Sequence, residues 1–257
     1  MHVVILCGGL GTRLREETEF RPKPMIPIGQ GQPILWHIMK YYSTFGFKKF
    51  VLCLGYRSDV IKNYFRNYHW HQRSITVRLG DDDIHLIHDS HGEEEWEVTL
   101  LDTGLNTMTG GRVRRAIPFV EGDNFLLTYG DGLIDSDITA SIETHNSKRA
   151  LVTMTAVRPP SRFGELDIDD GMVRAFREKP RDRHYINGGY FVCNRAIGDL
   201  IECDESVFER EPLERVARAG RLAAYQHEGF WQCMDTYREM VLLSEMWDEG
   251  KAPWKRW

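Results

Sequence analysis

The sequence lacks the features that mark membrane-embedded, disulfide-stabilised and nucleic-acid-binding proteins. No apolar stretch approaches the roughly 20 residues needed to cross a bilayer, and the first residues lead into a strand without a charged leader or a small-residue cleavage site. The five cysteines are odd in number, widely spaced and mostly set in apolar runs, a pattern typical of reduced, buried thiols. A formal net charge of −5 gives no general attraction to nucleic acid. We therefore expect a cytoplasmic protein with no membrane and no nucleic-acid partner, in which local cations hold any anionic ligand.

Apolar residues are abundant instead, at 42% of the chain, and they are enough to fill one sizeable core. In the first half, short strand-like apolar runs alternate with segments of helical spacing, and no repeat, low-complexity run or linker interrupts them. This alternation predicts a mostly parallel sheet with helices on both faces, where ligands gather at the carboxyl ends of the strands. We expect strands near residues 3–6, 50–54, 75–79, 98–101 and 125–129, and helices near residues 34–45 and 60–68.

From residue 150 onward the pattern becomes more antiparallel. The runs on either side of Asp169-Asp170-Gly171 predict a hairpin with an Asp-Gly turn, and a strand over 185–193 contains glycines that let a ligand or another backbone come close. Helices are expected near 211–219 and 236–249. The predicted fold class is α/β: one domain over residues 1–257 with a Rossmann-like mixed, mostly parallel sheet flanked by helices, and an antiparallel extension.

A glycine-rich loop follows the first predicted strand and is the most informative feature of the chain. Gly8, Gly9 and Gly11 let backbone N–H groups approach an anion closely. Arg13 and Lys23 supply the positive charge that a polyphosphate needs. The glycines alone fit a tight turn and phosphate binding equally well, but the nearby cations favour the second. The combination predicts a nucleoside triphosphate site.

Two familiar phosphate-binding motifs are excluded. A dinucleotide-binding fold runs from its glycines directly into a helix, which Pro22, Pro24 and Pro27 would interrupt here. A P-loop needs Gly-Lys followed by Ser or Thr, and that sequence is absent. The segment instead resembles the signature of the sugar-1-phosphate nucleotidyltransferases, with Cys7 where alanine is common.

This resemblance covers matched segments in order from residue 7 to residue 235. It implies a GT-A-like nucleotidyltransferase fold, with a nucleotide-binding half at about residues 1–149 and a sugar-binding half at about residues 150–257. It also implies Mg²⁺ as the cofactor and a catalytic role for Arg13 and Lys23 in holding the triphosphate. The nucleotide-binding residues that it implies are Gly8, Gly9, Gly11, Thr12, Arg13, Lys23, Asp102, Thr103, Gly104, Gly111, Arg112 and Asp131.

Two aspartates are the candidate metal ligands. Asp131 lies at a strand tip between two glycines, where its carboxylate is exposed and the backbone can adapt. Asp235 precedes the last predicted helix, and composition alone favours a helix N-cap there. The resemblance favours a metal role instead, because the two metal-binding aspartates of the family match Asp131 and Asp235.

The segment Glu178-Lys179-Pro180 follows the predicted hairpin and, taken alone, is typical of a charged strand end. In the family that the chain resembles, this lysine pairs with the sugar phosphate and the glutamate accepts from sugar hydroxyls. Phe163-Gly164-Glu165 and the glycines of the strand over 185–193 resemble further sugar-lining segments. The substrate-binding residues that the resemblance implies are Tyr129, Gly164, Glu178, Lys179, Asn187, Gly188 and Gly189.

A finer resemblance is to the glucose-1-phosphate cytidylyltransferases. It implies that a homo-oligomer converts CTP and glucose 1-phosphate to CDP-glucose and pyrophosphate, and that the product supplies surface polysaccharide such as O-antigen. The same chemistry with UTP or dTTP, or a non-catalytic sugar-nucleotide sensor, remain as alternatives. The finer resemblance rests on segments at residues 101–104, 108–112, 128–132, 230–232, 234–236 and 250–255.

Base specificity depends on the segment around Asp102. Relatives that transfer uridylyl or thymidylyl groups commonly carry glutamine at this place, and this chain does not. Cytosine presents an amino donor where uracil presents an acceptor, so a carboxylate or carbonyl oxygen suits cytosine. Asp102 could accept that hydrogen bond or cap its own loop. Arg112 matches an arginine of the cytidylyl relatives, and we expect it to meet phosphate oxygens.

Overall fold

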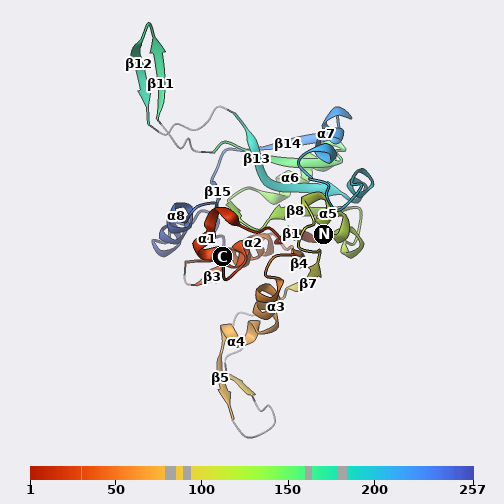
Figure 1. The fold of residues 1–257 in the computed structure, drawn as a ribbon. Helices are drawn as coiled ribbons and strands as arrows, with labels where there is room; N and C mark the ends of the chain where they lie inside the picture. Colours follow the sequence, from red (N-terminus) through yellow and green to blue (C-terminus); the bar gives the residue numbers. More distant parts are fainter. Residues whose placement is uncertain (30, 79–84, 89–93, 160–163, 179–183) are drawn as a thin grey trace.

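A seven-stranded mixed sheet runs through the centre of the molecule (Figure 1). The computed structural model describes residues 1–29, 31–78, 85–88, 94–159, 164–178 and 184–257. Every ladder of this sheet is parallel except the two that β13 makes with β8 and β10, so the predicted α/β class is confirmed. The strands, in spatial order, are β14 (Leu222–His227), β10 (Val152–Val157), β13 (Ile186–Asn194), β8 (Asn124–Tyr129), β1 (Val3–Leu6), β4 (Lys49–Leu54) and β7 (Glu97–Asp102).

Strand β1 lies inside the sheet, between β8 and β4, and all of its residues are buried. Side chains alternate between the two faces along a strand. Val3 and Ile5 therefore pack into the core on one face, and Val4 and Leu6 pack into the core on the other. A strand covered on both faces needs an uninterrupted apolar run, which is why the sequence predicts this strand so directly.

Helices cover both faces of the sheet. On one face, α2 and α8 contribute Ile38 and Leu243 to the core, and on the other, α5 and α7 contribute Val113 and Leu213. None of the helices in the described part of the chain is long and apolar enough to cross a bilayer. The helices are α1 (Arg15–Thr18), α2 (Ile34–Ser43), α3 (Ser58–Arg66), α4 (Tyr68–Gln72), α5 (Thr109–Ala116), α6 (Ile138–Lys148), α7 (Glu211–Arg218) and α8 (Tyr237–Asp248), with 3₁₀ turns η1 (Thr12–Leu14), η2 (Lys23–Met25), η3 (Ile117–Phe119) and η4 (Arg195–Leu200).

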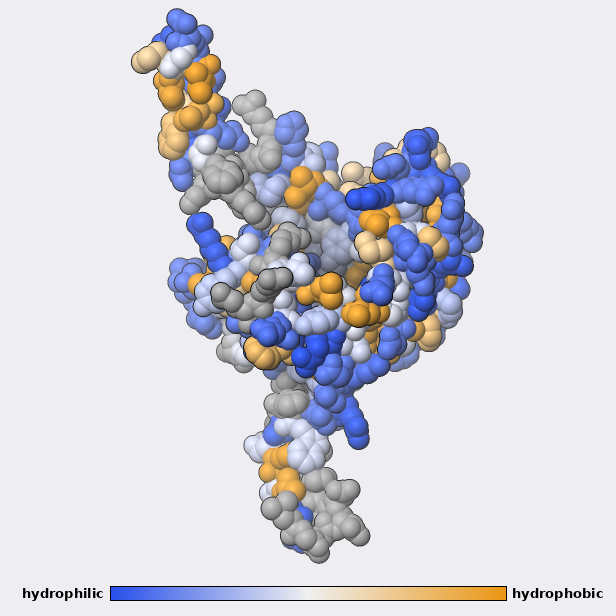
Figure 2. All heavy atoms as spheres, viewed as in Figure 1, coloured by the Kyte–Doolittle hydropathy of each residue, from blue (hydrophilic) through white to orange (hydrophobic). Residues whose placement is uncertain are grey.

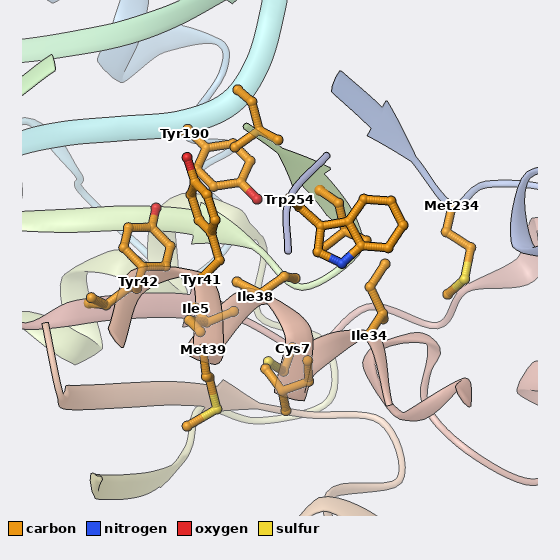
Figure 3. Close-up of a cluster of buried hydrophobic side chains, with 14 of the residues drawn as sticks. Ile5, Cys7, Ile34, Ile38, Met39, Tyr41, Tyr42, Tyr190, Met234 and Trp254 are labelled. Atoms are coloured by element: carbon orange, nitrogen blue, oxygen red, sulfur yellow. The ribbon is translucent and has the colours of Figure 1, made fainter. Parts of the chain in front are cut away.

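The core on the α2 side is shown in Figure 3. Tyr41 and Tyr42 of α2 gather there with Tyr190 of β13, and Trp254 from the C-terminal tail is fully buried among them. Met234 belongs to the same core and is also fully buried. Because Met234 directly precedes a candidate metal ligand, the packing that joins sheet and helices also holds that part of the chain in place.

Small ladders lie outside the main sheet, and one of them corrects an expectation. The strand expected near residues 75–79 is present as β5, but it pairs with β6 in a separate ladder and not with the parallel strands. Most of β5 is exposed, so it lacks the apolar run that a strand buried on both faces needs. Among the described residues these ladders are β2 (Pro27–Ile28) with β3 (Gln32–Pro33), β5 (Ser74–Val77) with β6 (His85–His88), β9 (Gly132–Ile134) with β15 (Trp231–Cys233), and β11 (Glu165–Asp169) with β12 (Met172–Arg177).

The second half of the chain extends the main sheet further than the sequence pattern predicts. Strands β10 and β14 pair in parallel, in register from Val152 with Leu222 to Val157 with His227. Parallel neighbours need a crossover connection, and α7 precedes β14 to provide it. The expected change to antiparallel pairing is confirmed for β13 but is wrong for the pair β10 and β14.

The β11–β12 hairpin projects far from the body of the molecule (Figure 1). Asp169 pairs with Met172, which leaves Asp170 and Gly171 as a two-residue turn. Both turn residues have positive φ, 47° and 74°, as a type I′ turn requires, so the predicted Asp-Gly hairpin is confirmed. Figure 2 shows apolar side chains along this hairpin, and the exposed ones are Leu166, Ile168, Met172, Val173 and Phe176.

Candidate active site

The carboxyl ends of four parallel strands meet at one edge of the sheet. Leu6 at the end of β1 lies in register with Cys53 of β4 and with Tyr129 of β8. Leu54 of β4 lies in register with Asp102 of β7. The loops that follow these strands therefore bring the glycine loop and the candidate metal ligand after β8 to one place, as expected for a ligand site in such a sheet.

A buried arginine lies beneath this edge. Arg112 of α5 is only 5% exposed, and its guanidinium donates to the main-chain oxygens of Leu54 at 2.9 Å and Gly8 at 3.2 Å. It also donates to the main-chain oxygen of Leu105 at 3.3 Å and to Thr103 Oγ1 at 2.5 Å. Burial lowers the pKa of Arg112, but an arginine remains charged at neutral pH. Arg112 thus ties together the loops after β1, β4 and β7, and its expected contact with phosphate oxygens stays a prediction.

Two glycines make room for this guanidinium. A Cβ atom at Gly8 would lie 2.1 Å from Nη1 of Arg112, and a Cβ atom at Gly55 would lie 2.7 Å from the same nitrogen. Among the described residues, in contrast, no atom lies within 4 Å of a Cβ added at Gly9. Gly11 has a φ of +62°, a conformation that favours glycine. Gly8 and Gly55 therefore serve the packing of Arg112, and Gly9 is the part of the loop that faces open space.

An open cavity borders the glycine loop. Its volume is about 410 Å³, a size suited to part of a nucleotide. One wall is fixed because the Tyr56 hydroxyl donates to the main-chain oxygen of Thr18 at 3.0 Å. Arg13 follows Thr12 in η1, and its side chain lies outside the part of the chain that the structure describes. The residues that line the cavity are Leu10, Thr12, Thr18, Glu19 and Tyr56.

Lys23 and the two candidate metal ligands converge beside this loop. The Lys23 ammonium lies 2.7 Å from Asp131 Oδ2 and 2.6 Å from Asp235 Oδ1. The lysine belongs to η2, whose residues are all buried, so the backbone from which the side chain extends is fixed beside the loop. Burial opposes the charged form of Lys23, but the two carboxylates outweigh it and raise the pKa of Lys23 above its ordinary value.

The β9–β15 ladder brings Asp235 to Asp131 across a long sequence separation. Gly132 pairs with Cys233, and the Met234 N–H donates to the main-chain oxygen of Asp131 at 2.8 Å. The Cys233 thiol lies 3.6 Å from Asp235 Oδ2, and burial together with the Asp235 carboxylate raises the pKa of that thiol to about 12. Cys233 therefore stays a neutral donor toward Asp235 at physiological pH.

The helix-cap alternative for Asp235 is excluded by the residue that follows it. Thr236 is the N-cap of α8, and Thr236 and Glu239 form a capping box. The Glu239 carboxylate accepts from the backbone N–H groups of both Asp235 and Thr236, at 2.7 Å and 2.8 Å. The cap thus leaves the carboxylate of Asp235 directed at Lys23.

The two carboxylates fit the requirements of Mg²⁺. This ion is held in proteins by one or two carboxylates, with water and phosphate oxygens completing its shell. Asp131 and Asp235 approach one point, because a single ammonium contacts both. The described residues contain no group of three or more histidine, cysteine or acidic side chains that could hold a metal ion. The donor set therefore suits a hard cation that keeps several outside ligands.

Asp102 caps its own loop. Its Oδ1 accepts from the backbone N–H of Gly104 at 3.1 Å, and its Oδ2 lies 3.6 Å from the Lys62 ammonium. Thr103 is buried and donates through its hydroxyl to the main-chain oxygen of Leu54 at 2.6 Å. The sequence left two roles open for Asp102, base recognition and loop capping. The structure supplies a partner for loop capping, the backbone N–H of Gly104. A contact between Asp102 and a base stays a prediction.

Gly111, expected among the nucleotide-binding residues, contacts a different part of the protein. A Cβ atom there would lie 2.6 Å from the main-chain oxygen of Asp204. The absence of a side chain at Gly111 lets α5 pack closely against the segment around residue 204. A contact between Gly111 and the nucleotide stays a prediction.

Several of the residues expected to bind the sugar are grouped around Tyr129 at the end of β8. The Tyr129 hydroxyl donates to the Glu209 carboxylate and accepts from the Asn187 amide at 3.4 Å. Burial, together with Glu209, raises the pKa of Tyr129, so the phenol stays neutral. Gly189 has a φ of +79°, and an added Cβ would lie 2.5 Å from the Tyr129 ring. The main-chain oxygen of Gly188 accepts from the Trp231 indole at 2.7 Å.

The other expected sugar residues lie at the base of the projecting hairpin. Gly164 precedes β11 and Glu178 follows β12. A Cβ atom at Gly164 would lie 2.6 Å from the Phe176 ring and 3.1 Å from Glu178 Oε2. Lys179 lies outside the described residues.

Sequence reasoning missed two residues that shape this site. Gly55 follows β4 as Gly8 follows β1, and a glycine after a second buried strand was the available signal. Glu209 accepts from both Tyr129 and Thr109, the latter at 2.7 Å, and so links Tyr129 to α5. No local sequence pattern predicts this role of Glu209, because the residue lies in an irregular segment and its partners are distant in the sequence.

Known proteins are similar to this chain in sequence and in fold. Residues 2–236 match the nucleotidyl transferase family. The chain is 51% identical to the glucose-1-phosphate cytidylyltransferase of Salmonella typhi and 51% identical to that of Salmonella typhimurium, over 100% of this chain and 100% of each relative. The crystal structure of HddC from Yersinia pseudotuberculosis superposes with a TM-score of 0.66, covering 95% of this chain and 98% of that chain at 24% sequence identity. That last likeness supports the fold alone.

The sheet, the glycine loop and these comparisons together define a nucleotidyltransferase of the GT-A-like fold, and the chain belongs to the nucleotidyl transferase family. Within that family it groups, along its full length, with the glucose-1-phosphate cytidylyltransferases. The resemblance drawn from the sequence is thereby confirmed at both levels.

Proposed function

We propose that this enzyme joins CTP and glucose 1-phosphate to give CDP-glucose and pyrophosphate, in a reaction that depends on Mg²⁺. The observation that carries the proposal is the convergence of Lys23, Asp131 and Asp235 beside the glycine loop. The full-length similarity to curated glucose-1-phosphate cytidylyltransferases supports the choice of substrates. We place the activity in the cytoplasm, where it would supply sugar nucleotides for surface polysaccharide.

Different residues of this chain have different roles in nucleotidyl transfer. The glycine loop, Arg13 and Lys23 hold the triphosphate, and Asp131 and Asp235 hold the Mg²⁺, which neutralises phosphate charge when bound. An oxygen of the sugar phosphate forms a bond to the α-phosphorus as the bond to the β-phosphate oxygen breaks and pyrophosphate leaves. The protein contributes positioning and charge and forms no covalent bond of its own.

The sugar phosphate is held by the second half of the chain. Lys179 pairs with the phosphate, and Glu178 accepts from sugar hydroxyls. The remaining sugar-facing residues in this proposal are Tyr129, Gly164, Asn187, Gly188 and Gly189. The Tyr129 hydroxyl is linked to Glu209 and Asn187, which supports a wall of fixed shape at this place.

CTP is the proposed nucleotide, and UTP or dTTP is the alternative within the same chemistry. A carbonyl or carboxylate oxygen near Asp102 suits the amino group of cytosine and would face an acceptor of uracil. A non-catalytic sugar-nucleotide sensor is the alternative from another class. It is disfavoured because Lys23 and both candidate metal ligands are retained and lie in contact.

We further propose that the enzyme is a homo-oligomer, and the projecting β11–β12 hairpin supports this. Leu166, Ile168, Val173 and Phe176 are each more than half exposed on it, and the register of the two strands places them on one face. Contiguous apolar surface of this kind marks interaction sites in soluble proteins. A second copy of the chain is the proposed partner.

Replacing Ile168 and Val173 together with lysine should dissociate this oligomer, because the two residues pair across the strands and share a face. Each buried apolar side chain of this size contributes about 1.5–3 kcal/mol, so losing two should weaken self-association by roughly a hundredfold or more. Sedimentation velocity measures the change, and Asp167→Ala on the same hairpin is the matched control. A wild-type protein that sediments as a monomer at micromolar concentration would refute the proposed assembly.

The reaction itself is tested by phosphorus NMR of a mixture of enzyme, Mg²⁺, CTP and glucose 1-phosphate. We expect the signals of CDP-glucose and pyrophosphate to grow in equal amounts as both substrates decline. Addition of pyrophosphate to CDP-glucose should run the reaction backward. If the protein binds CTP and glucose 1-phosphate but neither direction proceeds, the sensor alternative replaces the proposed enzyme.

A further inference from the structure

The Lys23 ammonium lies where a cation shared by Asp131 and Asp235 would have to be. It contacts one oxygen of each carboxylate, at 2.7 Å and 2.6 Å. The side chains of Lys23 and Asp235 are only 11% and 14% exposed, so water screens this contact weakly. The second oxygen of Asp235 faces the Cys233 thiol at 3.6 Å, which further limits how that carboxylate can turn.

Charge makes the same space unfavourable for a second cation. One ammonium between two carboxylates leaves the cluster of Lys23, Asp131 and Asp235 with a formal charge of −1, and without the ammonium it would carry −2. A divalent ion that bound both carboxylates would meet the ammonium at close range in a poorly screened site. The lysine side chain has a flexible stem and can move, whereas its backbone in η2 is buried and fixed.

We infer that Lys23 competes with the divalent cation for the carboxylates of Asp131 and Asp235, and that nucleotide phosphates release them by drawing the ammonium away. This inference rests on the proposed function, because it takes the triphosphate and Mg²⁺ as the ligands. It makes Lys23 a coupling residue as well as a phosphate ligand. Metal and nucleotide then each raise the affinity for the other, by the same factor.

The inference predicts a gain of metal binding when Lys23 loses its charge. Proton relaxation enhancement measures Mn²⁺ binding to the protein with no nucleotide present. Lys23→Met, or Lys23→Gln as a second variant that keeps a polar end, should bind Mn²⁺ alone at least about tenfold more tightly than the wild type, because an opposing charge is removed at close range. The same variants should bind CTP less tightly.

Lys49→Met is the matched control for this experiment. Lys49 also lies between two carboxylates, 2.8 Å from Glu121 and 3.9 Å from Glu97. These groups are exposed, and Lys49 is the first residue of β4, at the end of the strand opposite to the site. Lys49→Met should leave Mn²⁺ binding unchanged. The double variant Lys23→Met/Asp235→Asn should lose the gain, which would place the tighter Mn²⁺ site at the two aspartates. Circular dichroism verifies that each variant is folded.

The outcomes separate this inference from the proposed function. If folded Lys23→Met and Lys23→Gln bind Mn²⁺ alone no better than the wild type, competition by Lys23 is overturned. The proposed metal site would still stand if wild-type protein with CTP forms a ternary Mn²⁺ complex that Asp131→Asn abolishes. If Lys49→Met gains as much as Lys23→Met, the effect is one of general charge and the inference is also overturned.

Discussion

Asp131→Asn and Asp235→Asn should each lower turnover by about 10²- to 10³-fold while the protein stays folded. An amide fills the space of a carboxylate but is a poor ligand for Mg²⁺, so each variant removes one of the proposed metal contacts. The fold should survive because Asn can still accept from Lys23, and the cap of α8 rests on Thr236 and Glu239. Rates measured across a range of Mg²⁺ concentrations, with thermal melts in parallel, provide the test.

Asp137→Asn is the control for these two variants. Asp137 is the N-cap of α6, where its side chain accepts from two backbone N–H groups, and asparagine caps helices about as well as aspartate. We expect its turnover to remain within about twofold of the wild type. A variant of Asp235 with near-normal rate and unchanged Mg²⁺ dependence would remove that residue from the proposed metal site.

Gly8→Ala should destabilise the protein by about 3 kcal/mol, whereas Gly9→Ala should change its stability by less than about 0.5 kcal/mol. The added Cβ at Gly8 would lie 2.1 Å from Arg112 Nη1, and the guanidinium is held by hydrogen bonds on several sides. At Gly9 no atom in the described part of the chain lies within 4 Å of the new Cβ. In a domain of this size, the loss at Gly8 corresponds to a Tm lower by roughly 6–12 °C.

The same pair of variants reports on the function of the glycine loop. Gly8→Ala should also raise KM for CTP, because the loop that it displaces is the proposed triphosphate site. Differential scanning fluorimetry and steady-state kinetics measure the two effects. Equal destabilisation by the two alanines would show that Arg112 does not fix the loop in the way that its contacts indicate.

The location of the site could be predicted from the sequence because it depends on local features. Apolar runs identified β1, β4, β7 and β8, and a ligand site in a parallel sheet lies at the carboxyl ends of such strands. Asp131 lies two residues after the end of β8, so predicting that strand also located this aspartate. The spacing of Thr236 and Glu239 is typical of a capping box and was visible in the sequence. It would have identified Thr236, and not Asp235, as the N-cap of α8.

Other features depend on contacts between distant segments and left no local pattern. Arg112 was expected to meet phosphate, yet its guanidinium lies under the loop because Gly8 and Gly55 both lack a side chain there. The parallel pairing of β10 with β14 follows from packing that no single run of residues encodes. The placement of β5 outside the main sheet was missed for a different reason: the run is short and mostly exposed, and its partner β6 lies outside the main sheet as well.

The most direct measurement of the central claim is kcat/KM for CTP and for UTP, each with saturating glucose 1-phosphate and Mg²⁺. CTP should be preferred by at least about a hundredfold, because a pocket with an acceptor for the cytosine amino group leaves two acceptors facing each other when uracil binds. Equal use of CTP and UTP would contradict the cytidylyltransferase assignment, while the nucleotidyl transferase family and the proposed metal site would stand.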